Sequence, residues 1–181
     1  HIPFALCIKG ALIALHTNTK IAGTVQTRYW SMVPYQLGIG DTRQAIKYSA
    51  RACTPVKTSI PDHPIDNFLR ETLKNNLQKS DACMEFLLQS RTSADLSVED
   101  SMTEWKESQA PFYKVATIRI PQQVFDTPAQ NEFCENLSFS PWHAVAEHKP
   151  LGVTNRLRKV IYNHISQVRH EINSVPRVEP K

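Results

Sequence analysis

The sequence predicts an α+β fold, in which antiparallel strands are flanked by helices, and three observations support this class. Segments of strand composition are separated by a glycine-containing turn. Other segments repeat their apolar residues at helical spacing. The length of 181 residues, with 41% hydrophobic residues, suits one domain with a buried core.

Four strands are expected, over residues 27–35, 44–52, 82–90 and 113–120. Pro34 places the first strand at an edge or a bulge, because proline cannot donate a ladder hydrogen bond. Gly38, Gly40 and Asp41 mark a turn, so the first two strands should pair in an antiparallel manner. The last strand alternates apolar and polar side chains, which indicates that it is half-buried.

Four helices are expected, over residues 3–17, 64–79, 129–135 and 154–173. Pro64 suits the first position of its helix, and Thr154 can cap the last one. The first helix is interpreted as packing into the core. Lys9 and Gly10 interrupt its apolar run, which is shorter than the about 20 residues that cross a bilayer, so no membrane span is expected. The polar segment 91–111 is expected to wrap over the domain, held by Trp105.

The chain divides into three regions. Residues 1–26 are an N-terminal helix and linker, residues 27–173 are the main domain, and residues 174–181 are expected to be a disordered tail. An apolar run follows His1 directly and no initiator methionine is present. This favours a start in the middle of a longer protein.

The charge and the cysteine pattern indicate which binding partners and which cellular compartment to expect. The net charge of +4 comes from 21 basic and 17 acidic residues that are scattered along the chain, so no nucleic-acid partner is expected. The four cysteines lie far apart and have neither C-x-x-C nor metal-finger spacing. We therefore expect free thiols and a cytoplasmic location. These cysteines are Cys7, Cys53, Cys83 and Cys134.

The helix predicted over residues 154–173 carries the most specific chemistry. Arg158, Tyr162 and Arg169 project within roughly 40° of one another, at about 100° per residue, beside the apolar stripe. The stripe consists of Leu157, Val160, Ile161, His164, Ile165, Val168 and Ile172. Two guanidinium groups thus flank one phenol on a single wall of the helix.

This arrangement suits a tyrosinate metal ligand. A tyrosine has a reference pKa of about 10, so its anion needs stabilisation at neutral pH. Arg158, one turn before Tyr162, supplies a charge and a hydrogen bond. Ferric haem accepts tyrosinate, and Arg169 can pair with a propionate. The alternative is an amphipathic helix with two surface arginines and a tyrosine at the edge of the core.

Other catalytic classes lack support. The histidines do not have the spacing of a zinc protease, and the helical pair His164 and His170 lies on different faces. No serine stands in a G-x-S-x-G turn, and Cys134 has no arranged base. Zinc chemistry and covalent hydrolysis are therefore not expected.

The C-terminal part of the chain resembles the catalase-related haem proteins, the compact relatives of catalase that include coral-type allene oxide synthase. The resemblance covers most of residues 27–173 and is most specific in the last forty or so of them. The first motif is Phe133-Cys134-Glu135-Asn136-Leu137-Ser138-Phe139-x-Pro141-Trp142-His143. The second is Glu147-His148-x-Pro150-Leu151-Gly152-x-x-Asn155-Arg156-x-Arg158-x-x-x-Tyr162. Upstream, the matching run is Tyr29-Trp30-Ser31-Met32-x-Pro34-Tyr35-x-Leu37-Gly38.

The resemblance implies part of a catalase-type antiparallel β-barrel with flanking helices. It places Tyr162 at the proximal ligand of haem b, Arg158 at the arginine that keeps this tyrosine anionic, and Arg169 near the propionates. Phe139 and Pro141 match a loop on the proximal side. The family's distal histidine and asparagine belong to an N-terminal half that this sequence does not contain.

Two functions follow. In the first, the chain is the proximal half of a catalase-like haem protein that acts on hydrogen peroxide or organic hydroperoxides. The distal half then comes from the same protein or from a separate chain, and a homo-oligomer is left open. In the second, the chain is a haem-free structural or interaction subunit that keeps the fold without activity. The intact Arg158-x-x-x-Tyr162 pair favours the first.

Overall fold

A computed structural model describes residues 8, 11–13, 15, 20–54 and 59–176. Most of the helix predicted over residues 3–17 lies outside this set. The residues of it that are described are helical but exposed, so the expected packing into the core is wrong for them. Most of the predicted tail, residues 177–181, is also outside the described part. Within the described part, none of the helices has the length and apolar character that crossing a membrane requires.

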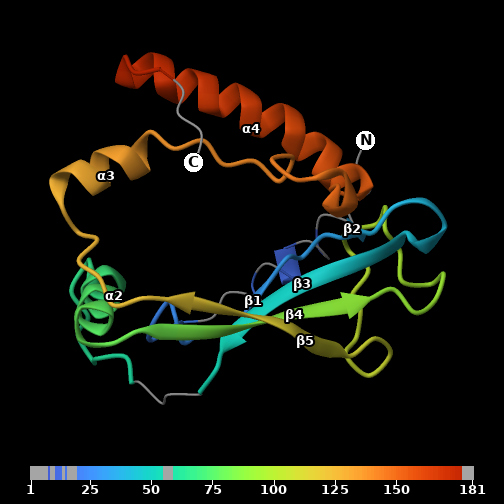
Figure 1. Cartoon of the computed structure of the whole chain (residues 1–181), viewed down its shortest axis with the longest axis horizontal. Coiled ribbons are helices and arrows are strands. Elements are labelled where there is room, and N and C mark those ends of the chain that lie inside the picture. The colour runs from blue at the N-terminus through green and yellow to red at the C-terminus, as the bar shows by residue number, and fades with distance from the viewer. Residues whose placement is uncertain (1–7, 9–10, 14, 16–19, 55–58, 177–181) are drawn as a thin grey trace.

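Five antiparallel strands form one sheet in the order β1-β3-β4-β5, and β2 pairs with β3 beside β1 (Figure 1). The strands are β1 (Tyr29–Trp30), β2 (Tyr35–Leu37), β3 (Gln44–Ala52), β4 (Ala82–Ser90) and β5 (Phe112–Ile120). The predicted bounds of β3 and β4 are confirmed. The strand predicted over residues 27–35 is wrong as a single element, because Met32 has a left-handed φ of 58° and breaks it before Pro34.

The predicted turn between β2 and β3 is confirmed. Leu37 pairs with Gln44 in an antiparallel register. Gly38 and Gly40 have φ values of 79° and 58°, which residues with a Cβ adopt only at a cost in free energy. Both glycines therefore allow the backbone of this turn to adopt positive φ values.

Strand β5 is an open edge of the sheet. The prediction that it is half-buried is wrong, because residues 113–119 are all exposed. The reason is that, among the described residues, β5 packs closely only against β4 at the edge of the sheet, and no strand covers its other edge and no helix packs closely on its faces. Tyr113 and Val115 are about half exposed, at 49% and 50%. The described sheet is consequently not closed into the expected barrel.

The core lies at the centre of the sheet and under the loop that follows β4. Ile46 and Leu87 are almost fully buried between neighbouring strands. Leu96, Trp105 and Ala110 form a buried cluster within segment 91–111. The Trp105 indole donates a hydrogen bond to the Ser97 carbonyl at 3.1 Å, so the prediction that Trp105 holds this loop is confirmed.

Three α-helices accompany the sheet in the described part beyond residue 20: α2 (Phe68–Lys79), α3 (Pro128–Glu135) and α4 (Gly152–Asn173). Helix α2 starts later than predicted, and Pro64 lies in the loop before it. The prediction of α3 is confirmed, with Thr127 as its N-cap. Helix α4 begins two residues before Thr154, so the predicted threonine cap is wrong.

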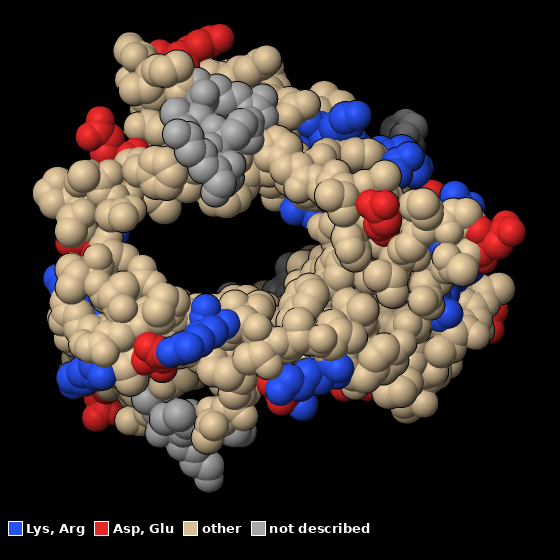
Figure 2. Space-filling view, viewed as in Figure 1, with Lys and Arg blue, Asp and Glu red and all other residues tan. Residues whose placement is uncertain are grey.

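Helix α4 lies across from the sheet, joined to it by α3 and by segment 136–151, which contains the short 3-10 helix Ala146–His148 (Figure 1). The space-filling view shows an opening through the molecule between these two parts (Figure 2). The apolar stripe of α4 is largely exposed, and Val160 and Ile172 are 68% and 76% exposed. Instead α4 buries a polar face, because segment 136–151 and the loops of the sheet meet that side. The buried residues are Gly152, Asn155, Ser166 and His170.

Two of the cysteines predicted to be free thiols are joined by a disulfide. Cys53, just after β3, forms a disulfide with Cys83 in β4, since the antiparallel register places the two side by side. Cys134 is free and exposed, and Cys7 lies outside the described residues. The expectation of free thiols is wrong for Cys53 and Cys83, and the cytoplasmic location stays a prediction.

Asp126 joins α2 to the start of α3. Its carboxylate accepts hydrogen bonds from Arg70 and Asn131 and pairs with Lys74 at 3.2 Å. The Arg70 guanidinium, then Asn131 and Lys74, hold the pKa of Asp126 well below its usual range. The carboxylate therefore stabilises the fold at neutral pH, and this contribution is lost as the pH falls below about 4 towards the folded-state pKa.

We expect Asp126→Asn to lower Tm at pH 7 by roughly 2–4 °C. The difference from the wild type should shrink as the pH falls below 4, as measured by thermal unfolding followed by circular dichroism. Asp95→Asn, at an exposed loop position, is the control and should leave Tm unchanged. A difference for Asp126→Asn that stays constant with pH would contradict this account.

Candidate functional site

The position of α4 is set where its N-terminus meets the sheet. Tyr35 of β2 forms an antiparallel bridge with Pro150, and the Leu151 amide donates to the Pro34 carbonyl at 3.1 Å. Gly152 then turns the chain into the helix with a φ of 83°. A Cβ at Gly152 would lie 2.3 Å from the Val98 main-chain oxygen, so only glycine fits there.

Polar contacts hold the remainder of α4. Near its start, Arg156 makes a bidentate pair with Glu99, at 3.1 and 2.8 Å. Near its end, the hydroxyl groups of Ser166 and Ser138 hydrogen-bond at 3.0 Å. The Nε2 atom of His170 lies 2.9 Å from the Asn136 carbonyl. These contacts tie both ends of α4 to neighbouring segments of the chain.

Arg158 and Tyr162 form a pair one turn apart on α4. The Arg158 Nη2 atom donates to the phenol oxygen at 3.0 Å, and the guanidinium carbon lies 5.0 Å from the centre of the Tyr162 ring. Burial acts to lower the pKa of Arg158, but hydrogen bonds and charge interactions with Tyr162 and with Tyr35 together outweigh it and raise that pKa. The guanidinium therefore stays charged beside the phenol oxygen.

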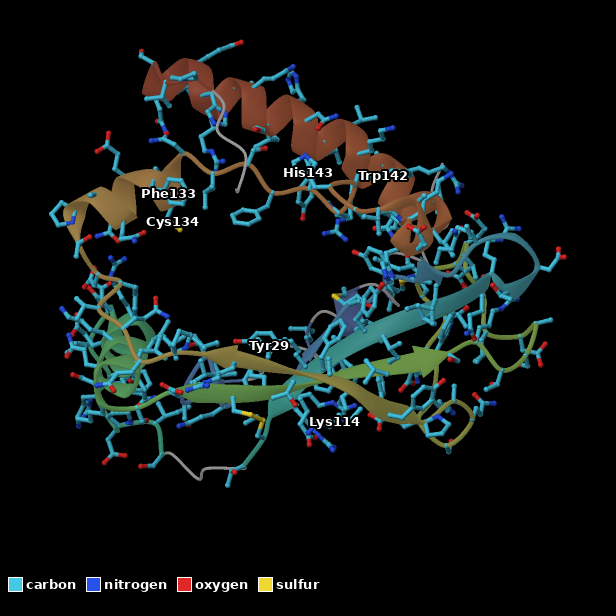
Figure 3. All side chains as sticks on the ribbon, viewed as in Figure 1. Tyr29, Lys114, Phe133, Cys134, Trp142 and His143 are labelled. Atoms are coloured by element: carbon cyan, nitrogen blue, oxygen red, sulfur yellow. A yellow bond between two sulfur atoms is a disulfide. The ribbon has the colours of Figure 1, made fainter. Side chains whose placement is uncertain are left out.

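The pair lines a cavity of about 650 Å³, a size typical of small-molecule and cofactor sites. Its walls come from β2, from the segment before α4 and from α4 itself. His143 and Trp142 lie on that segment, on the α4 side of the opening (Figure 3). The residues that line the cavity are Tyr35, Phe139, Ser140, Pro141, His143, Arg158 and Tyr162.

Aromatic side chains of the sheet support the far wall of this cavity. The ring of Tyr35 packs on Tyr48 of β3, with 5.1 Å between the ring centres. The Tyr48 hydroxyl lies 3.2 Å from the Nδ1 atom of His148. Burial, and next the neighbouring Tyr35, raise the pKa of Tyr48, so its phenol keeps its proton and can donate to His148.

Of the predicted site residues, the structure brings Arg158 and Tyr162 together but not Arg169. The Arg169 guanidinium donates to the Leu137 carbonyl, which ties α4 to the end of the α3 segment. Its Nε atom is buried and has no hydrogen-bond partner among the described residues. Arg169 does not line the cavity, and its role at a propionate stays a prediction.

Sequence reasoning missed several residues of the site. Tyr35 and Asn155 stand in the motifs that carry the resemblance, which is the signal that could have found them. His143 and Ser140 also line the cavity, and the zinc-protease spacing does not identify them. Phe139 and Pro141, matched to a loop on the proximal side, do line it together with Tyr162.

The chain is similar in structure to solved catalases. A fungal catalase matches with a TM-score of 0.66 and 16% identity, over 82% of this chain and 32% of the catalase. The fold is catalase-like. A bacterial catalase matches with a TM-score of 0.65 and 12% identity, over 82% of this chain and 31% of that one. This chain thus spans about a third of the length of the catalases that it matches. No protein-family model and no curated protein sequence matches it.

Gly152 provides a test of how the site is positioned. We expect Gly152→Ala to lower the free energy of unfolding, because the left-handed backbone costs about 1–2 kcal/mol and the Val98 oxygen blocks the new Cβ. Gly40→Ala is the matched control, since Gly40 also has a positive φ but no atom lies within 4 Å of the place that a Cβ would take.

In urea unfolding, Gly152→Ala should be the less stable variant by at least about 1 kcal/mol. Equal losses in the two variants would show that the close approach to Val98 does not matter.

Proposed function

We propose that this chain is the proximal, haem-ligating part of a catalase-like protein that acts on hydrogen peroxide or organic hydroperoxides. The observation that carries the proposal is the Arg158 guanidinium held 3.0 Å from the Tyr162 phenol oxygen in a cavity of about 650 Å³. A phenol beside a fixed cation is the donor that ferric haem accepts as a tyrosinate ligand. The catalase-like fold supports the same interpretation.

The residues of the cavity fit one face of a haem. Tyr162 would hold the iron, and Arg158 would keep the phenolate anionic by charge and hydrogen bond. Phe139 and Pro141 offer apolar contacts to a flat ring. Bound haem b would supply the redox chemistry with the peroxide. The Arg169 Nη2 atom already donates to the Leu137 carbonyl, so a propionate would be bound by the other nitrogens of this guanidinium.

The other face requires a second polypeptide segment. The chain spans about a third of the catalases that it matches, and β5 presents a nine-residue edge that no described strand covers. Open edges readily pair with a further strand. We propose that the remaining part of a catalase-like fold, from the same protein or from a separate chain, pairs with β5 and supplies the distal histidine and asparagine.

An absorption spectrum tests the haem ligand. We expect the native protein, purified with its accompanying segment, to show a high-spin ferric Soret band that is lost in Tyr162→Phe, because phenylalanine has no oxygen to bind iron. Tyr113→Phe on β5 is the control and should keep the band. A native mass measurement of the same sample identifies the accompanying segment.

Lack of a Soret band in the native particle, with the accompanying segment present, would contradict the haem proposal. That result would favour a haem-free structural or interaction subunit. The second function agrees with the present engagement of Arg169 at the Leu137 carbonyl.

Two arginines on α4 allow a matched comparison. We expect Arg158→Gln to weaken the binding of ferric haem by roughly tenfold or more, which is the value of a hydrogen bond to a charged group. Arg156→Gln removes the same charge two residues away but breaks only the pair with Glu99. It should change the affinity little. Spectroscopic titration with haem measures both, and equal effects would mean that only the net charge of α4 matters.

A further inference from the structure

Asn155 is the most buried polar residue of α4, with an exposure of 0%. A buried amide is costly unless its donors and its acceptor are all paired. Its Nδ2 atom donates to the Pro34 carbonyl at 3.0 Å and to the Leu151 carbonyl at 2.9 Å. Both amide hydrogens are therefore used by the backbone of the segments that flank β2 and α4.

These two bonds decide which way the amide faces. If the amide were flipped, its oxygen would point at two carbonyl oxygens, and both contacts would become repulsive. The Oδ1 atom of Asn155 must therefore point along α4, where it accepts a bond from the Arg158 Nη1 atom at 3.3 Å. The main-chain carbonyl of Asn155 is fixed as well, since the Trp142 indole donates to it at 2.7 Å.

The terminal nitrogens of Arg158 then face two acceptors on α4, beside Tyr35, whose side chain also hydrogen-bonds this guanidinium. One faces the Asn155 oxygen, and the other donates to the Tyr162 phenol at 3.0 Å. The three residues follow one another at i, i+3 and i+7 along the same side of the helix. An arginine loses considerable rotamer freedom when it is fixed, and a rigid acceptor on its own helix favours the bound rotamer.

We propose that Asn155 is a positioning residue, which holds the Arg158 guanidinium against the Tyr162 oxygen. In the peroxide reaction this role rests on the proposed function, in which Tyr162 binds iron. The contact itself belongs to the chain alone. Asn155 thus acts on the Tyr162 side chain through Arg158, without contacting Tyr162 itself.

Nitration of the chain by tetranitromethane tests this without haem, because the reagent modifies phenolate in preference to phenol. Tyr162 is 37% exposed and so accessible, and Tyr113 on β5 is an internal reference. We expect Asn155→Ala to slow the nitration of Tyr162 relative to Tyr113 by roughly threefold to tenfold, the range of one hydrogen bond. Peptide mass spectrometry measures the two rates, and circular dichroism checks folding.

A double-mutant cycle separates positioning from a merely structural role. Arg158→Gln alone should also slow the nitration, and adding Asn155→Ala to it should have no further effect, since the residue through which Asn155 acts is gone. Equal effects of Asn155→Ala in both backgrounds, or none in either, would overturn the proposal. Trp142→Phe is the control, because it removes the bond to the main-chain carbonyl of Asn155 but leaves the side-chain amide of Asn155 in place.

Asn155→Ser is the second variant, for use if the alanine variant does not fold, because its hydroxyl retains one polar contact in the buried site. It should follow the same cycle with a smaller effect. The haem titration of the same variants is a separate arm. If the wild-type protein does not bind haem, the proposed function is wrong. The nitration result, and with it the role of Asn155, would still stand.

Discussion

The buried amide of Asn155 is the contact on which the placement of α4 depends. It joins the first turn of α4 to the Pro34 carbonyl next to β2, across a sequence separation of 121 residues. Because the amide has no exposure, its hydrogen bonds cannot be exchanged with water at low cost. Together with Gly152, which approaches the Val98 backbone closely, it fixes where α4 begins and how it is rotated.

That rotation separates three faces of α4. The packed face consists of polar residues and a glycine, and Asn155, Ser166 and His170 lie along it in that order. The opposite face carries the exposed apolar stripe. Arg158 and Tyr162 lie between the two, so they border the cavity while α4 is held by hydrogen bonds on their other side. The chain spans about a third of the catalases it matches, and its described part has an open β5 edge, an exposed apolar stripe and a central opening (Figure 2).

Local patterns predicted the parts of the site that depend on one helix. The pairing of Arg158 with Tyr162 follows from their spacing of four residues, which places them one turn apart wherever the helix lies. Arg169 lies on the same side by helical geometry, but its partner is the Leu137 carbonyl, which comes from another segment. Tyr35 reaches the cavity only because β2 pairs with β3 and bridges to Pro150. No spacing in the sequence indicates this contact.

The sequence by itself determined the strands β3 and β4, the turn at Gly38 and Gly40, the helix α3 and the Arg158–Tyr162 pair, since each depends on neighbours within a few residues or on a local period. Tertiary structure alone decided which face of α4 is buried, that β5 is an open edge, and that Cys53 meets Cys83. Hydrophobic periodicity marks a face of a helix as apolar, but it does not say what covers that face. In this chain, hydrogen bonds from buried polar groups decided the packing of α4 instead.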